Sequence, residues 1–195
     1  MVGAKWVGRL TGRDHDNGAE SKRTVAGMNV TLECAALALL LFAALHDLAV
    51  RTVPNYVAAS LLLIGAVIRT FEHDLFPALA AALVMFLLLF GLWVAGLMGG
   101  GDVKLWAASV LLIPPSVRLE SAFLANVVIL GGVLAILYLL LPLVISKPAA
   151  SRAGSFFRRF LRAERWRIKR RAPLPYACAI AGGAFAVLLP QILKS

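Results

Sequence analysis

The chain has 195 residues, of which 61% are hydrophobic, and its net charge is +10. Soluble domains contain roughly 45 to 50% apolar residues, and here the excess lies in long uninterrupted runs, which excludes a soluble globular protein. The basic charge does not indicate nucleic-acid binding, because half of the 20 Lys and Arg residues lie in one segment, 147–171, between apolar runs.

Residues 1–29 are polar and of mixed charge, and they lack the apolar core and cleavage site of a signal peptide. We expect a disordered polar tail here. Met28 directly precedes the first apolar run. We therefore expect the natural start at Met28, with the preceding residues being additional upstream translation.

The rest of the chain, 30–195, is expected to form one membrane domain. A hydrocarbon layer about 30 Å thick requires about 20 helical residues for each crossing. The apolar runs therefore predict an all-α polytopic membrane protein with about six transmembrane helices, at residues 30–50, 54–70, 75–97, 102–115, 121–145 and 174–193. Pro54 suits a first helical turn, glycines 99–101 should end the third helix, and Pro114 and Pro115 make the fourth the shortest.

Glycines in the last two predicted helices are expected to serve helix packing. Gly131, Gly132, Gly182 and Gly183 occur as pairs within apolar runs. Small residues allow the backbones of neighbouring membrane helices to approach closely. We therefore predict that all four lie at contacts between helices.

The basic loop 147–172 predicts the orientation, because connections rich in Lys and Arg remain in the cytoplasm. Its segment 155–171 is compatible with an amphipathic helix on anionic lipid headgroups and equally with a solvated basic loop. Counting crossings from this loop places the connections after the first and third helices in the cytoplasm. The loops with Glu72, Asp74 and Glu120 then lie outside. The basic residues of 1–29 conflict with this orientation unless the chain starts at Met28.

Two carboxylates, Asp47 and Asp102, lie at the predicted inner ends of the first and fourth helices. An acid inside the membrane costs about 2.5 to 3.5 kcal/mol at mid-membrane on insertion scales, so both require an explanation. Asp47 could pair with Arg51 one turn later, and Asp102 could cap the fourth helix. Three glycines, 99–101, however, offer backbone freedom and close approach of another chain. Two acids beside such a turn are what a protease with a catalytic pair of aspartates would need.

Three stretches resemble the bacterial type IV prepilin peptidases, which are GxGD aspartyl proteases. GGGDVKLWAA at 99–108 is similar to the GxGD signature, HDLAVRTVPN at 46–55 to the first aspartate motif, and PLPYACAIAGGA at 173–184 to the start of the last span. The resemblance extends from about residue 31 to the C-terminus. It implies the GxGD aspartyl protease fold, and it places the two catalytic aspartates on Asp47 and Asp102. Nothing matches the CxxC methyltransferase region of larger members, so the chain looks like the short form of tight-adherence (Flp) pilus systems.

The resemblance implies an endopeptidase of the bacterial inner membrane that removes the leader of prepilin or pseudopilin precursors. It also implies that the cut is made at the cytoplasmic face, just before the apolar helix of the precursor. Two neighbouring acids would share one proton, so that one activates water and the other donates to the scissile carbonyl, without a metal or cofactor. Residues 99–101 (Gly99, Gly100 and Gly101) and Lys104 would support the loop or the substrate. For Lys104 the simpler reading, a lysine whose ammonium extends to the inner membrane interface, is favoured over a role in the site.

The main alternative is an ion- or proton-coupled transporter or channel in which Asp47 and Asp102 bind protons or cations. It predicts acids near mid-membrane and an internal repeat, and the sequence indicates neither clearly. Cys34 and Cys178 are isolated in apolar runs, so a CxxC metal site or a disulfide framework is not indicated.

Overall fold

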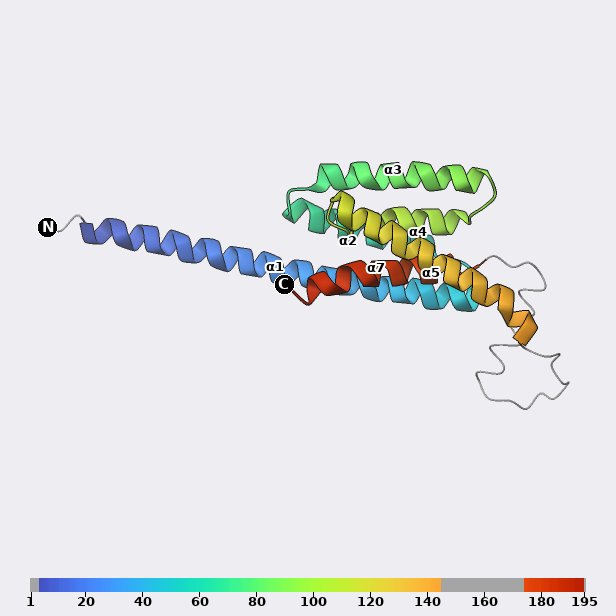
Figure 1. The fold of residues 1–195 in the computed structure, drawn as a ribbon. Helices are drawn as coiled ribbons and strands as arrows, with labels where there is room; N and C mark the ends of the chain where they lie inside the picture. The colour runs from blue at the N-terminus through green and yellow to red at the C-terminus, as the bar shows by residue number, and fades with distance from the viewer. Residues whose placement is uncertain (1–3, 145–173, 195) are drawn as a thin grey trace.

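The structure is a computed structural model that describes the backbone of residues 4–144 and 174–194 and the side chains of 24–140 and 174–194. Its helices are α1 (Ala4–Val50), α2 (Asn55–Phe71), α3 (Leu75–Val94), α4 (Gly100–Val110), α5 (Val117–Val144) and α7 (Tyr176–Ile192) (Figure 1). The described residues contain no strand. The predicted all-α class is therefore confirmed.

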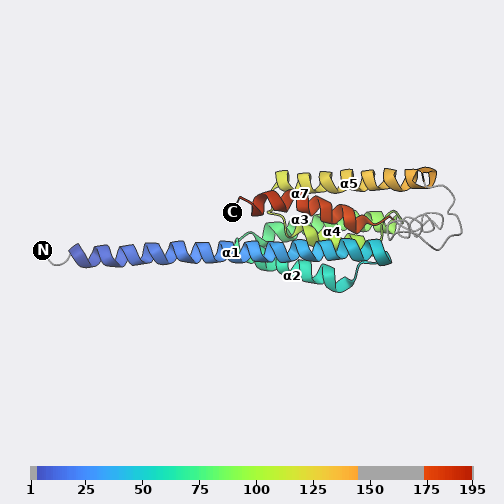
Figure 2. The ribbon, with the colours of Figure 1, turned by 90° about the horizontal axis from the view of Figure 1, so that it is seen from below.

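Successive helices run in opposite directions, so helix ends gather at two ends of the bundle (Figures 1 and 2). At one end, called here the Asp47 end, α1 stops and α4 and α7 begin. At the other, called the Arg69 end, α2 stops and α3 begins. Helix α7 packs against α1, α4 and α5, whereas α3 packs mainly on α4 and only lightly on α2. The core therefore lies around α1, α4 and α7, and α3 forms an edge.

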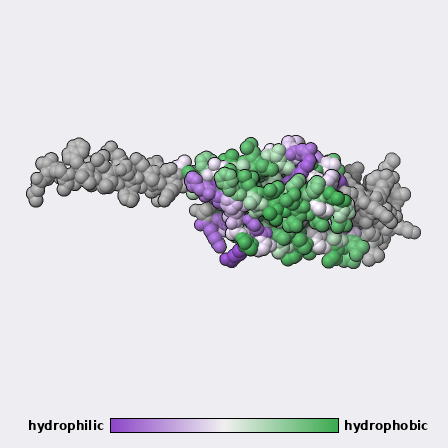
Figure 3. All heavy atoms as spheres, turned by 90° about the horizontal axis from the view of Figure 1, so that it is seen from above, coloured by the Kyte–Doolittle hydropathy of each residue, from purple (hydrophilic) through white to green (hydrophobic). Residues whose placement is uncertain are grey.

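Apolar side chains cover much of the molecular surface, as Figure 3 shows for one face. In α3 only Ala78 and Leu89 are buried. Three helical stretches of the described chain are long and apolar enough to cross a membrane, Thr24–Val50, Leu75–Val94 and Val117–Leu140, and Asn55–Phe71 and Tyr176–Ile192 are shorter apolar helices. A water-soluble protein does not expose so much contiguous apolar surface. The chain is an all-α membrane protein.

The fourth predicted helix is indeed the shortest of the helices in the described ranges. Helix α4 has 11 residues, which corresponds to a rise of about 16 Å. That is roughly half the hydrocarbon thickness, so α4 alone does not cross a bilayer. The count of about six crossings stays a prediction.

The third helix ends earlier than predicted. It stops at Val94, before Gly96, whose φ is +74°. The Gly96 N–H donates to the carbonyl of Trp93 at 2.9 Å, and the Leu97 N–H to that of Leu92 at 3.0 Å. This is a Schellman motif, in which glycine takes the left-handed position at low cost. The prediction that glycines 99–101 end this helix was wrong, because Gly96 ends it first.

Other boundaries differ from the prediction by a few residues. Pro54 is the N-cap of α2 and not a residue of its first turn, with ψ of 135°. Gly100 and Gly101 belong to α4, and α5 begins at Val117, four residues before the predicted start. The segment 155–171 and the basic loop 147–172 both lie wholly outside the described residues.

The expected disordered tail also differs from the structure, since α1 extends back to Ala4. The sequence before Pro54 contains no proline, so no residue there lacks the N–H that a helix needs. A helix that begins in the apolar run can therefore continue through the polar segment. The expectation that the natural chain starts at Met28 stays a prediction.

Two of the four glycines that were predicted at helix contacts lie where two helices approach each other closely. A Cβ at Gly182 would lie 2.7 Å from the side chain of Leu130, and one at Gly183 would lie 2.5 Å from that of Val127. Gly131 makes ordinary contacts with α7 at 3.8 Å or more. The prediction for Gly132 was wrong, because a Cβ there would meet nothing within 4 Å.

Helix α2 approaches α4 most closely at Gly65. A Cβ at this position would lie 3.1 Å from the backbone carbon and oxygen of Leu111. Backbone atoms cannot move aside as the end of a flexible side chain can. The glycine is therefore required by the distance between the two helices.

Gly65→Ala should lower the stability of the protein by about 1–3 kcal/mol, the usual cost of overpacking. The measurement is the thermal unfolding midpoint of the purified protein in detergent. Gly91→Ala is the matched control, because a Cβ at Gly91 would meet nothing within 4 Å. An equal midpoint for both variants would contradict the close α2–α4 contact.

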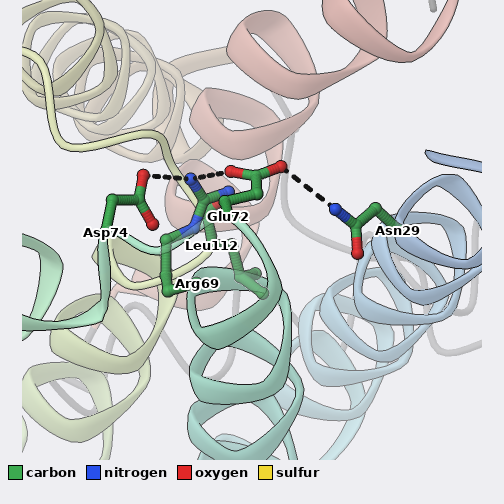
Figure 4. A network of polar contacts seen from close by, with 5 residues as sticks. All are labelled: Asn29, Arg69, Glu72, Asp74 and Leu112. Carbon is green, nitrogen blue, oxygen red and sulfur yellow. Dashed lines mark hydrogen bonds and ion pairs between the residues drawn. The ribbon is translucent and has the colours of Figure 1, made fainter. Parts of the chain in front are cut away.

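A buried arginine joins several elements at the Arg69 end (Figure 4). Arg69 is fully buried, and its Nη1 lies 2.6 Å from Glu72 Oε2 and 3.1 Å from Asp74 Oδ2. Its Nη2 donates to the carbonyl of Leu112 at 3.1 Å, and Asn29 of α1 donates to Glu72 at 3.2 Å. This network links α1, α2, the start of α3 and the residues after α4.

Arg69→Met should destabilise the protein, because it removes the partner of two carboxylates and of a carbonyl. Breaking a buried pair costs about 3–5 kcal/mol, and the partial exposure of Glu72 and Asp74 reduces that cost. The unfolding midpoint in detergent measures the effect. Arg118→Met, at an exposed position of α5, is the control. If both variants unfold at the same temperature, the network does not hold the helices together.

Candidate active site

Asp47 and Asp102 line the same cavity, although they are 55 residues apart in the sequence. Asp47 lies in the last turn of α1, and Asp102 lies in the first turn of α4. The cavity has a volume of about 290 Å³, and its other lining residues are Arg51, Thr52, Val53, Asn55, Gly99, Gly101 and Leu174. The fold thus forms a paired-acid cavity at the Asp47 end.

The start of α7 holds the carboxylate of Asp47. The Asp47 side chain is 5% exposed, and its Oδ2 accepts a hydrogen bond from the backbone N–H of Ala177 at 3.4 Å. Ala177 lies in the first turn of α7, after the N-cap Pro175. The first four N–H groups of a helix lack partners within it, and they carry partial positive charge. The beginning of α7 therefore supplies both a donor and a favourable field to a carboxylate that is otherwise buried.

A strained turn follows Asp47. Arg51 ends α1 with a φ of +64°, and its N–H donates to the Asp47 carbonyl at 2.8 Å. Its guanidinium donates to the Tyr138 hydroxyl of α5 at 3.0 Å and lies 5.2 Å from the ring centroid. His46 Nδ1 donates to the carbonyl of Thr52 at 2.8 Å, across the turn. A non-glycine residue keeps a positive φ only where its surroundings enforce it. Here the contacts of Tyr138 with the Arg51 side chain and of His46 with Thr52 surround the turn.

The glycine triplet serves close packing rather than unusual backbone angles. None of Gly99, Gly100 and Gly101 has a positive φ. A Cβ at Gly99 would lie 2.9 Å from Asp102 Oδ2, and one at Gly100 would lie 3.2 Å from the indole nitrogen of Trp93. Gly101 makes ordinary contact with Val53 at 3.5 Å. The backbone freedom expected of these glycines is not used here, and the close approach of another chain stays a prediction.

Lys104 lies outside the lining of the cavity. Its Nζ donates to Asn55 Oδ1 at 3.4 Å, which ties the second turn of α4 to the first residue of α2. Asn55 does line the cavity, whereas Gly100 does not. Of the residues predicted for the site, the structure therefore brings Asp47, Asp102, Gly99 and Gly101 together and leaves Gly100 and Lys104 as neighbours.

The comparison with known families bears on this same region. The model of the type IV leader peptidase family matches residues 34–140, more than half of the chain. The match contains Asp47, the turn after it, the glycine triplet and Asp102. The chain belongs to the type IV leader peptidase family. Neither a curated protein nor a solved structure matches it.

Membership of this family makes the protein a peptidase embedded in a membrane. It confirms the resemblance seen in the sequence motifs. The matched residues end at 140, so α7, which holds Asp47, lies beyond the match. The contact of α7 with Asp47 is therefore seen in the structure and lies outside the family match.

Gly99→Ala should reduce leader removal by the peptidase, because its Cβ would displace the carboxylate of Asp102. A misplacement of about 1 Å can cost roughly 100-fold in rate. Gly101→Ala introduces the same methyl group at an ordinary contact distance, so its cleavage rate should fall much less. The initial rate of precursor cleavage checks both variants. A Gly99→Ala enzyme as active as Gly101→Ala would show that the Asp102 position does not matter.

Proposed function

We propose that the protein is an aspartic endopeptidase that removes the leader of type IV prepilins of the Flp type. Asp47 and Asp102 form its catalytic pair. The observation that supports this most strongly is the shared cavity of the two aspartates, within the region matched by the family model. The volume of about 290 Å³ has room for a water molecule, which occupies about 30 Å³ of liquid, and for a short extended peptide.

In the proposed reaction the two carboxyl groups share one proton, because two close carboxylates do not easily both ionise. The ionised group takes a proton from water, and the water oxygen bonds to the scissile carbonyl carbon. The protonated group gives its proton to the carbonyl oxygen, which forms a tetrahedral diol. The C–N bond then breaks as the amine nitrogen gains a proton from the pair, and one hydroxyl of the diol returns a proton to the pair as the product carboxyl group forms. Either aspartate can begin as the base, because the proton changes position during each turnover.

Residues around the pair would stabilise its single negative charge. The Ala177 N–H reaches Asp47 directly, and Arg51 contributes a cation at the same cavity. Burial strengthens such interactions, because the local dielectric constant is lower than that of water. A site arranged before the substrate arrives lowers the cost of developing charge in the transition state.

The active site is proposed to face the cytoplasm. The basic segment 147–171 follows α5, and α5 ends at the Asp47 end of the bundle. Connections rich in Lys and Arg stay on the cytoplasmic side of bacterial membranes. The leader of an inserted precursor would then be cut on the side where it is made.

The transporter alternative is less well supported. It requires acids near the middle of the membrane, in the path of an ion. Asp47 is in the last turn of α1 and Asp102 is in the first turn of α4, so both lie at helix ends. A peptidase family match also favours hydrolysis over transport.

Asp47→Asn and Asp102→Asn should each abolish precursor cleavage, because an amide can neither accept the proton of water nor donate as an acid does. The test is co-expression with a Flp-type prepilin and a gel that separates the precursor from the mature form. Glu120→Gln, an acid-to-amide change outside the cavity, is the matched control and should cleave normally. Wild-type cleavage by either aspartate variant would refute the dyad.

A further inference from the structure

An apolar groove runs beside the paired-acid cavity, between α2, α3 and α4. It has a volume of about 400 Å³ and is lined by four residues of each helix. Five of these are alanines, and we call it the alanine groove: Ala58, Ala59, Ala82, Ala107 and Ala108. It exists because α3 packs mainly on α4 and only lightly on α2. Figure 1 shows α3 along this edge of the bundle.

The alanine groove and the paired-acid cavity share one lining residue, Asn55, so they adjoin each other at the start of α2. The Asn55 side chain accepts a hydrogen bond from Lys104, and Lys104 also lines the groove. The groove is therefore polar where it meets the cavity, and the rest of its lining is apolar. A molecule that occupied both would have a polar segment next to the two aspartates and an apolar segment beyond them.

The shape of the alanine groove suits one face of a helix. Its lining extends from Asn55 to Leu62 on α2 and from Lys104 to Leu111 on α4, which is about two helical turns, or roughly 10 Å. The small alanine side chains leave space in the groove, and small residues allow a second helix to approach closely in a membrane. An unwound segment there needs polar partners, because lipid supplies none. Asn55 and Lys104 are such partners.

We propose that the alanine groove binds the first two turns of the apolar helix of the precursor, next to the bond that is cut. This inference rests on the proposed function, and it adds the position of the substrate helix. The extended residues before that helix pass Asn55 and Lys104 into the cavity of Asp47 and Asp102. The groove thus determines which peptide bond reaches the two carboxyl groups.

Ala59→Phe fills the groove from an exposed position of α2 and leaves the core unchanged. Ala80→Phe is the matched control, on an exposed face of α3 outside the groove. Each variant is assayed with the full precursor and with a soluble peptide that has the leader and the cut site but no apolar helix. With the full precursor, Ala59→Phe should raise KM at least about tenfold at similar kcat, as expected when a pocket contact is lost. Cleavage of the peptide should be unchanged.

Several outcomes separate this inference from the proposed function. If Asp102→Asn cleaves neither substrate but Ala59→Phe cleaves the full precursor as the wild type does, the catalytic role of Asp102 is supported. The proposed binding of the precursor helix in the alanine groove is then overturned. The groove proposal is also overturned if Ala59→Phe impairs cleavage of the soluble peptide as much as cleavage of the full precursor. The same holds if Ala80→Phe impairs precursor cleavage as much as Ala59→Phe does. Cleavage of the peptide by Asp102→Asn would instead refute the proposed function.

Cross-linking provides a second measurement that does not depend on turnover. A cysteine at Leu62, in the groove, should form a disulfide with a cysteine in the second turn of the precursor helix, in an Asp102→Asn enzyme. A cysteine at Leu88, exposed on α3 outside the groove, is the control. Equal cross-linking at both positions, or cross-linking of position 62 only to a second copy of the enzyme, would overturn the proposal.

Discussion

The structure depends on the burial of one carboxylate, that of Asp47, at a point where three helices have their ends. A carboxylate taken out of water needs hydrogen-bond donors and positive charge nearby. Asp47 obtains a donor from the Ala177 N–H at the start of α7, and Arg51 places a cation at the same cavity. The hydrogen bond to Asp47 therefore links the start of α7 to the end of α1. The start of α4, with Asp102, completes the same cavity.

The bundle has polar groups at both ends and apolar packing between them. The network around Arg69 joins α1 to α2 through Asn29, and the paired-acid cavity lies at the opposite end of α1. From Asn29 to Asp47, α1 rises about 27 Å at 1.5 Å per residue. This is close to the hydrocarbon thickness of about 30 Å. Two polar clusters at that separation are consistent with charged residues near both surfaces of a membrane.

Much of the fold could be predicted from the sequence, because long apolar runs separated by turn residues leave few alternatives in a membrane. The pairing of Asp47 with Asp102 was predicted from the motifs and the count of crossings. The role of Ala177 could not be predicted, since it acts through a backbone N–H that any residue but proline has. Tyr138 and Arg69 were missed for another reason. Each lies in an apolar run, and the sequence does not show which neighbouring helix it contacts.

The glycines show the limit of sequence reasoning most clearly. Gly132 looks like Gly183 in the sequence, yet only Gly183 faces a neighbouring helix closely. The rotation of a helix decides this, and an apolar run that is hydrophobic on all sides does not reveal its rotation. Gly96 ended α3 although three consecutive glycines follow it, because a single residue in the left-handed position is sufficient.

Positions 47 and 102 line one cavity, and cysteine cross-linking can measure how close they are in the membrane. Cys34 and Cys178 are first replaced by serine, and Asp47→Cys is combined with Asp102→Cys in the full-length protein in membranes. A short thiol-to-thiol reagent should join positions 47 and 102 efficiently, and it should not join 47 to a cysteine at position 74, at the Arg69 end. If both cysteines react with the reagent but are never joined, or if they are labelled from opposite sides of the membrane, the account is wrong.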